Sequence, residues 1–129
     1  MLRSLLPIAT LTIALLSTGC SNAQAPAEVT PQEFAALADK DNFILLDVRT
    51  PEEWNAGRMK DAVHIDWYAD DFTARVSKLD KSKPVLVYCA SGGRSSEAQD
   101  AMRDLGFKQV VNLDGGMKAW RAAGLPVVK

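Results

Sequence analysis

One cysteine stands where an apolar run ends and a loop of small residues begins. Cys89 follows the run at 84–88 (PVLVY), and a helix-like stretch comes a few residues later. The sequence therefore predicts a thiol at the carboxyl end of a buried strand, beside the amino end of a helix. Backbone N–H groups at such a place bind anions and lower the pKa of a thiol. The residues of the intervening loop are Ala90, Ser91, Gly92, Gly93, Arg94 and Ser95.

The beginning of the chain has the pattern of a secretory signal. Arg3 is followed by an uncharged, mostly apolar stretch over 4–16, and Ser17-Thr18-Gly19 supplies the small residues of a cleavage site. The stretch is too short for a comfortable membrane span and leads into a polar segment. A cysteine at the cut, Cys20, is similar to bacterial lipoprotein signals, although Ser17 stands where those usually have Leu. Ordinary secretion and a plain N-terminal anchor are the alternatives.

We expect a signal peptide over 1–19, a lipid on Cys20 and a flexible tether over 20–28, followed by one domain over 29–129. This predicts a protein of the cell envelope that faces the periplasm and meets the membrane through its lipid anchor only. Without residues 1–19 the net charge is −2, and acidic and basic residues are interspersed, which argues against a nucleic-acid partner. If Cys20 is lipidated, Cys89 has no cysteine to pair with. It is then either a reactive thiol or a buried apolar residue.

Helix-like and strand-like segments alternate after the tether. Two capping boxes, Thr30-Pro31-Gln32-Glu33 and Thr50-Pro51-Glu52-Glu53, each predict the start of a helix. Helices are expected from 30 to about 39, 50–57, 71–79, about 95–105 and 115–124, and strands over 43–48, 62–65, 85–88 and 109–113. Apolar strands separated by helices indicate an α/β fold, a mostly parallel sheet with helices on both faces. Ligands bind such sheets at the carboxyl ends of the strands.

Three segments together resemble a single-domain rhodanese, a sulfurtransferase. They are Leu46–Trp54 (LDVRTPEEW), Cys89–Ser95 (CASGGRS) and Leu113–Trp120 (LDGGMKAW), and the resemblance covers about 29–128. It implies a five-stranded, mostly parallel sheet, a cysteine that carries a persulfide, and a loop whose N–H groups cradle the transferred sulfur. The pattern is broken at 58–61 (RMKD), where similar proteins usually have His, a branched apolar residue and Gly-Ala. We expect a surface turn there.

The resemblance implies sulfur transfer from a small donor such as thiosulfate, through Cys89, to a thiol or cyanide. Arg94 would bind the anion, or else it is only a solvated charge at a helix start. Ser91 and Ser95 would donate hydroxyl hydrogen bonds, and Ser95 could equally be a plain helix cap. We expect a monomer without a cofactor.

Other polar and aromatic residues have simpler interpretations. Asp47 and Arg49 are expected to form a structural ion pair that braces the loop. His64 has no partner at metal-ligand spacing, so no metal site is expected, and it is interpreted as a half-buried strand residue. The tryptophans are interpreted as core or rim residues, namely Trp54, Trp67 and Trp120.

Three alternative functions remain open. A cysteine phosphatase or arsenate reductase also uses a cysteine, a loop of amides and an arginine, but needs five residues between Cys and Arg, and this chain has four. A non-catalytic binding module of the same fold usually lacks the cysteine. A thiol oxidoreductase is disfavoured because no second cysteine forms a Cys-x-x-Cys motif with Cys89.

Overall fold

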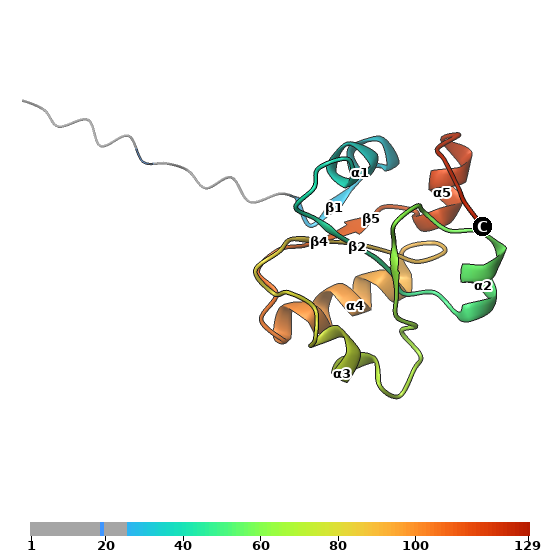
Figure 1. Ribbon diagram of the computed structural model, residues 1–129. Coiled ribbons are helices and arrows are strands. Elements are labelled where there is room, and N and C mark those ends of the chain that lie inside the picture. The colour runs from blue at the N-terminus through green and yellow to red at the C-terminus, as the bar shows by residue number, and fades with distance from the viewer. Residues whose placement is uncertain (1–18, 20–25) are drawn as a thin grey trace, which may run out of the picture.

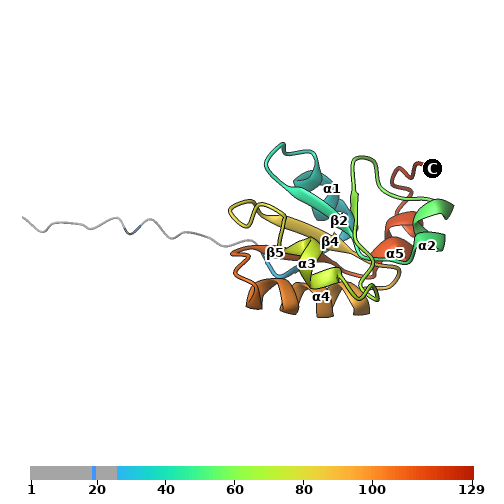
Figure 2. The same cartoon turned by 60° about the horizontal axis from the view of Figure 1, so that its bottom comes forward.

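The computed structural model describes residue 19 and residues 26–129. Residues 1–18 of the expected signal peptide over 1–19, and Cys20 with its expected lipid, lie outside the described residues. Among the helices of the described part, none is both long and apolar enough to cross a bilayer. Helices lie on both faces of a central sheet (Figures 1 and 2).

The sheet has five strands, all parallel, in the order β1-β5-β4-β2-β3. The strands are β1 (Glu28–Val29), β2 (Ile44–Asp47), β3 (Val63–His64), β4 (Val85–Tyr88) and β5 (Val110–Leu113). The central strand β4 is buried throughout and pairs with β2 and β5. The α/β fold with a five-stranded parallel sheet is confirmed, and Cys89 follows its central strand.

Two helical layers cover the sheet. Helices α1 (Pro31–Ala38) and α5 (Gly116–Ala122) cover one face, and α3 (Phe72–Val76) and α4 (Gly93–Asp104) cover the other (Figure 2). The short helix α2 (Pro51–Ala56) lies near the carboxyl terminus of the chain (Figure 1).

Because side chains alternate along a strand, β4 contributes to both cores. Val85, Val87 and then Cys89 join the core under α3 and α4. Leu86 and Tyr88 join the core under α1 and α5. The two cores together exclude water from both faces of the sheet, and burial of this apolar surface is the main stabilising contribution to the fold.

Both predicted capping boxes are present. The Thr30 hydroxyl accepts from the Glu33 N–H, the Thr50 hydroxyl accepts from the Glu53 N–H, and each glutamate receives the N–H of its threonine in return. These contacts satisfy N–H groups that a helix start would otherwise leave without partners. The second box also fixes the position of the Glu53 side chain at the start of α2.

Three local expectations differ from the structure. Glu28, assigned to the tether, is the first residue of β1, a two-residue strand that is too short to show periodicity. Helix α3 is shorter than 71–79, and its N-cap Asp71 makes no side-chain capping bond. The turn at 58–61 is only partly a surface turn, because Met59 is 3 % exposed and its N–H donates to the Tyr88 hydroxyl.

Candidate functional site: the Cys89 loop

The Cys89 thiol lies at the carboxyl end of β4 and faces α4. The residue is 1 % exposed and free of any disulfide. Its Sγ accepts the Gly92 N–H at 3.1 Å and the Ser95 hydroxyl at 3.2 Å. The loop thus wraps around the sulfur with its donors pointing inward, as the sequence order predicts.

These donors set the acidity of the thiol. Burial raises the pKa of Cys89, but hydrogen bonds from the Ser95 hydroxyl and from the N–H groups of Ser95, Gly92 and Ser91 outweigh it. The pKa therefore lies below the ordinary value of a thiol. Because the thiolate is the nucleophilic form, the loop prepares Cys89 for attack on an electrophile.

The Ser95 hydroxyl has two possible acceptors, although it carries one hydrogen. Its Oγ lies 3.2 Å from the Cys89 sulfur and 3.2 Å from the carbonyl oxygen of Gly92. Since a thiolate is the stronger acceptor, ionisation of Cys89 favours the bond to sulfur. Ser95 is buried inside α4, so it acts here as a donor to the loop and not as a plain helix cap.

The start of α5 holds the first part of the loop. The Met117 N–H donates to the Cys89 carbonyl at 2.8 Å, and the Lys118 N–H donates to the Ala90 carbonyl at 2.9 Å. Gly116 makes this approach possible: a Cβ there would lie 2.6 Å from the Cys89 oxygen, and its φ is +57°. Only glycine fits such a position without displacing the backbone. This contact gives the Gly-Gly pair of the third matching segment a physical role.

Arg94 is paired with a carboxylate from a distant helix. Its two guanidinium NH2 groups donate to both carboxylate oxygens of Glu53, at 2.7 and 2.9 Å. These bonds lower the pKa of Glu53 to about 2, against the opposing effect of burial. The guanidinium carbon of Arg94 also lies over the exposed Tyr68 ring, 5.8 Å from the ring centroid. Arg94 is therefore neither a free anion receptor nor a freely solvated charge.

A buried network supports the far side of the loop. The Asn112 amide on β5 donates to the Gly92 carbonyl at 3.4 Å and to the Glu28 carboxylate at 3.1 Å. The Gln99 amide donates to the Ala27 and Val110 carbonyls. These bonds join β1 to β5, α4 and the loop. These bonds join segments far apart in the chain and were not predicted. Asn112, a polar residue within the apolar strand segment 110–113 (VVNL), was the available signal.

The expected ion pair of Asp47 and Arg49 exists but lies beside the loop. Asp47 and Arg49 form a buried ion pair at 2.6 Å, and Arg49 also donates to the Gly57 carbonyl. The pair therefore ties β2 to the turn after α2. His64 is half-buried, as expected: its Nε2 lies 2.7 Å from the Arg49 carbonyl oxygen, and its ring stacks on Trp54 at 4.7 Å. Within the described residues no group of three or more His, Cys, Asp or Glu side chains could hold a metal.

The fold and the loop define a class: α/β proteins in which a cysteine at the end of the central strand is hydrogen-bonded by the following loop and has a lowered pKa. The chain belongs to the rhodanese-like family, since the model of the rhodanese-like domain matches residues 30–123. This assignment agrees with the resemblance found in the sequence, and it supports a role of sulfurtransferase type.

Individual relatives agree with this family. A sulfurtransferase from Allochromatium vinosum is 38 % identical over 92 residues, which are 71 % of this chain and 84 % of the relative. A thiosulfate sulfurtransferase GlpE from Pseudomonas savastanoi pv. phaseolicola is 33 % identical over 95 residues, covering 73 % and 86 % of the two chains. The crystal structure of a rhodanese-related protein from Thermoplasma volcanium superposes with a TM-score of 0.71 at 26 % identity, over 80 % of this chain and 98 % of the other.

Proposed function

We propose that this protein transfers a sulfane sulfur from a small donor such as thiosulfate to a thiol or cyanide acceptor, through a persulfide on Cys89. The observation that carries the proposal is the hydrogen bonding of the Cys89 sulfur by Gly92 and Ser95, which lowers the pKa of the thiol from its ordinary value. The relatives named as sulfurtransferases support the same chemistry.

The first step is attack of the Cys89 thiolate on the outer sulfur of thiosulfate. The sulfur–sulfur bond of thiosulfate breaks, and sulfite leaves with the bonding electron pair. Cys89 then carries the transferred sulfur as a persulfide. The inward N–H groups of the loop are placed to stabilise the negative charge of this persulfide.

The second step returns the enzyme to its starting state. An acceptor thiolate or cyanide attacks the outer persulfide sulfur, and the Cys89 thiolate leaves with the electron pair of the broken bond. No net redox change occurs, and no external electron source is needed. Two half-reactions at one cysteine predict ping-pong kinetics with small-molecule partners, and we propose that the protein acts as a monomer.

The shape of the loop argues against the phosphatase alternative. Arg94 is held by Glu53, and the Ser95 and Gly92 donors converge on the sulfur of Cys89. A ring with four residues between cysteine and arginine has less room for a tetrahedral oxyanion than one with five. This arrangement suits one added sulfur atom better than a phosphate.

The mass of the intact protein tests the proposal. Treatment with thiosulfate should add one sulfur atom, and cyanide should remove it with formation of thiocyanate. Cys89→Ser should show neither the added mass nor turnover, while its circular dichroism stays native. Hydrolysis of an aryl phosphate or reduction of arsenate by the wild type, with no mass change from thiosulfate, would support the phosphatase class instead.

We also propose that the protein is an envelope lipoprotein, cleaved before Cys20 and facing the periplasm. The support is the basic and apolar pattern of 1–19 and the small residues before Cys20. Cys20→Ala should block processing or release the protein from membranes, as judged by fractionation and by labelling with a fatty acid. Wild-type protein found entirely in the soluble periplasmic fraction and cut elsewhere would contradict this proposal and leave the enzymatic proposal untouched.

A further inference from the structure

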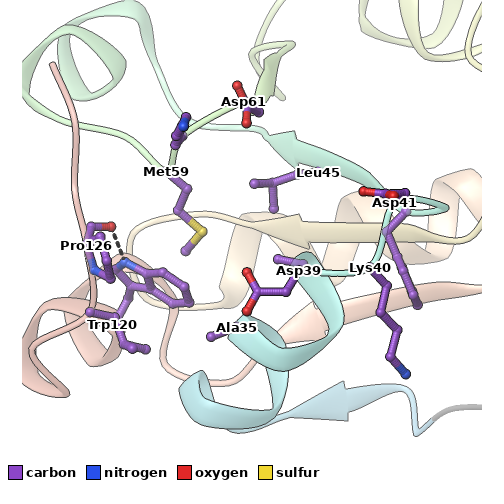
Figure 3. A pocket seen from close by; sticks show the side chains of 13 residues that line it. Ala35, Asp39, Lys40, Asp41, Leu45, Met59, Asp61, Trp120 and Pro126 are labelled. Atoms are coloured by element: carbon purple, nitrogen blue, oxygen red, sulfur yellow. Dashed lines mark hydrogen bonds between the residues drawn. The ribbon is translucent and has the colours of Figure 1, made fainter.

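A hollow of about 590 Å³ opens on the α1 and α5 face of the sheet, the face opposite to Cys89 (Figure 3). Its floor is largely apolar and includes the Trp120 indole, Met59 and Leu45. Ring and thioether surfaces accept varied apolar groups without demanding one shape. The hollow thus offers a binding surface that the sulfur chemistry does not use.

Three exposed aspartates are among the residues that line this hollow. Asp39, Asp41 and Asp61 make no side-chain hydrogen bond or ion pair within the described residues. The Asp39 carboxylate points toward Trp120, whereas the Lys40 side chain extends away from it (Figure 3). Lys60 also lines the hollow and is exposed. Carboxylates therefore outnumber ammonium groups around an apolar floor.

Asp39 lies at the carboxyl end of α1. It is the C-cap of α1, at the negative end of the helix dipole, and the last turn of α1 holds no basic residue. Asp61 has a φ of +64°, the left-handed region that non-glycine residues rarely adopt. Met59, Lys60 and Asp61 also belong to the segment that departs from the pattern of similar proteins. A cation bound beside Asp39 would interact favourably with this end of α1.

We propose that this hollow binds an organic ammonium ion with an apolar chain. A carboxylate and the face of a tryptophan are together the two groups that favour an ammonium, one by charge and the other through its ring quadrupole. The ammonium is held between Asp39 and Trp120, and the chain covers Met59 and Leu45. The site is independent of the Cys89 reaction, because the sheet separates the two.

Titration of the purified protein with n-hexylammonium chloride tests the site, with the tryptophan indole N–H signals followed by NMR. We expect a saturable shift of the Trp120 signal, assigned with Trp120→Phe. The Trp67 signal should stay unchanged, since Trp67 packs in the core on the other face. Hexan-1-ol should bind more weakly and hexanoate not measurably, and added salt should weaken binding of the ammonium.

Asp39→Asn tests the role of the charge with little change of shape. The substitution should lower the affinity of the protein for hexylammonium roughly two- to fivefold. Asp104→Asn is the matched control, because Asp104 also ends a helix but lies on α4, across the sheet. Its affinity should equal that of the wild type. Absence of saturable binding would overturn the proposal, and so would equal affinity for hexylammonium and hexan-1-ol or an unchanged affinity in Asp39→Asn.

Discussion

The Arg94 guanidinium meets the Glu53 carboxylate edge to edge, with two short hydrogen bonds. Glu53 is at the same time the third helical residue of α2 and completes the Thr50 capping box. The Glu53 carboxylate therefore both caps the start of α2 and binds Arg94 of the Cys89 loop. The pairing neutralises a charge that would otherwise attract anionic donors.

Variants of the two partners should change the use of thiosulfate in opposite directions. Glu53→Gln leaves the Arg94 charge uncompensated, so the KM for thiosulfate should fall severalfold and depend more strongly on salt. Arg94→Ala leaves the Glu53 carboxylate uncompensated beside the loop, so turnover with the anionic donor thiosulfate should fall more than turnover with a neutral persulfide donor. Steady-state kinetics with both donors measures this. The exposed neighbour variant Glu52→Gln serves as the control, and a higher KM for thiosulfate in Glu53→Gln would contradict the prediction.

Because of the same ion pair, we expect the free energy of unfolding to fall in acid. The pKa of Glu53 is lowered from the ordinary 4.5 to about 2, chiefly by the hydrogen bonds from Arg94. A folded-state pKa below the unfolded one stabilises the protein above the unfolded value, and this contribution is lost as the pH falls from about 4.5 toward 2. Urea unfolding should show a stability difference between wild type and Glu53→Gln that is constant at neutral pH and shrinks in this window. A difference independent of pH would show that the bridge adds no stability.

Ser95 should control the acidity of the nucleophile. Ser95→Ala removes the hydroxyl that donates to the Cys89 sulfur, so the pKa of Cys89 should rise toward the ordinary value of a thiol. The pH profile of Cys89 alkylation by iodoacetamide should therefore move to higher pH, and so should the acid limb of turnover. Ser96→Ala, one position further along α4 and exposed, is the control. An unchanged profile would mean that the backbone N–H groups alone set the pKa.

The sequence was sufficient to predict those elements whose determining residues lie close together in the chain. The apolar run before Cys89 predicts a buried strand, the glycines after it predict a loop, and both capping boxes lie where Thr30 and Thr50 predict them. In each case the residues that make the structure are within a few positions of one another. Cys89 and the six residues after it could therefore be proposed as one site from the sequence, although Gly93–Ser95 belong to α4, which begins two residues earlier than predicted.

Contacts between distant segments could not be read from the sequence. Glu53 and Arg94 are 41 residues apart, and neither residue alone indicates the other. Strand β1 has two residues and exists because β5 offers it a partner, with Asn112 reaching Glu28. The low pKa of Cys89 depends on donors whose direction is set by the fold. Such features follow from the tertiary arrangement, which periodicity and propensity do not encode.

Gly116 provides the sharpest test of how the loop is held. In Gly116→Ala the new Cβ would lie 2.6 Å from the carbonyl oxygen of Cys89 and 2.6 Å from the carbonyl carbon of Ala90. Because backbone atoms cannot yield as a flexible side chain does, the loop must move, and its N–H groups no longer converge on the sulfur. We expect most of the sulfurtransferase turnover to be lost and the pKa of Cys89 to rise.

Gly124→Ala is the control that separates the effect of the steric clash at position 116 from the effect of a strained positive φ. Gly124 also has a left-handed φ, +71°, but nothing lies within 4 Å of a Cβ placed there. Both variants should lose about 1–3 kcal/mol of unfolding free energy from the strained φ, measured in urea. Gly124→Ala should keep wild-type turnover at 25 °C, and Gly116→Ala should be less stable than Gly124→Ala as well as nearly inactive. Equal turnover in the two variants would show that the contact between α5 and the Cys89 carbonyl does not position the loop.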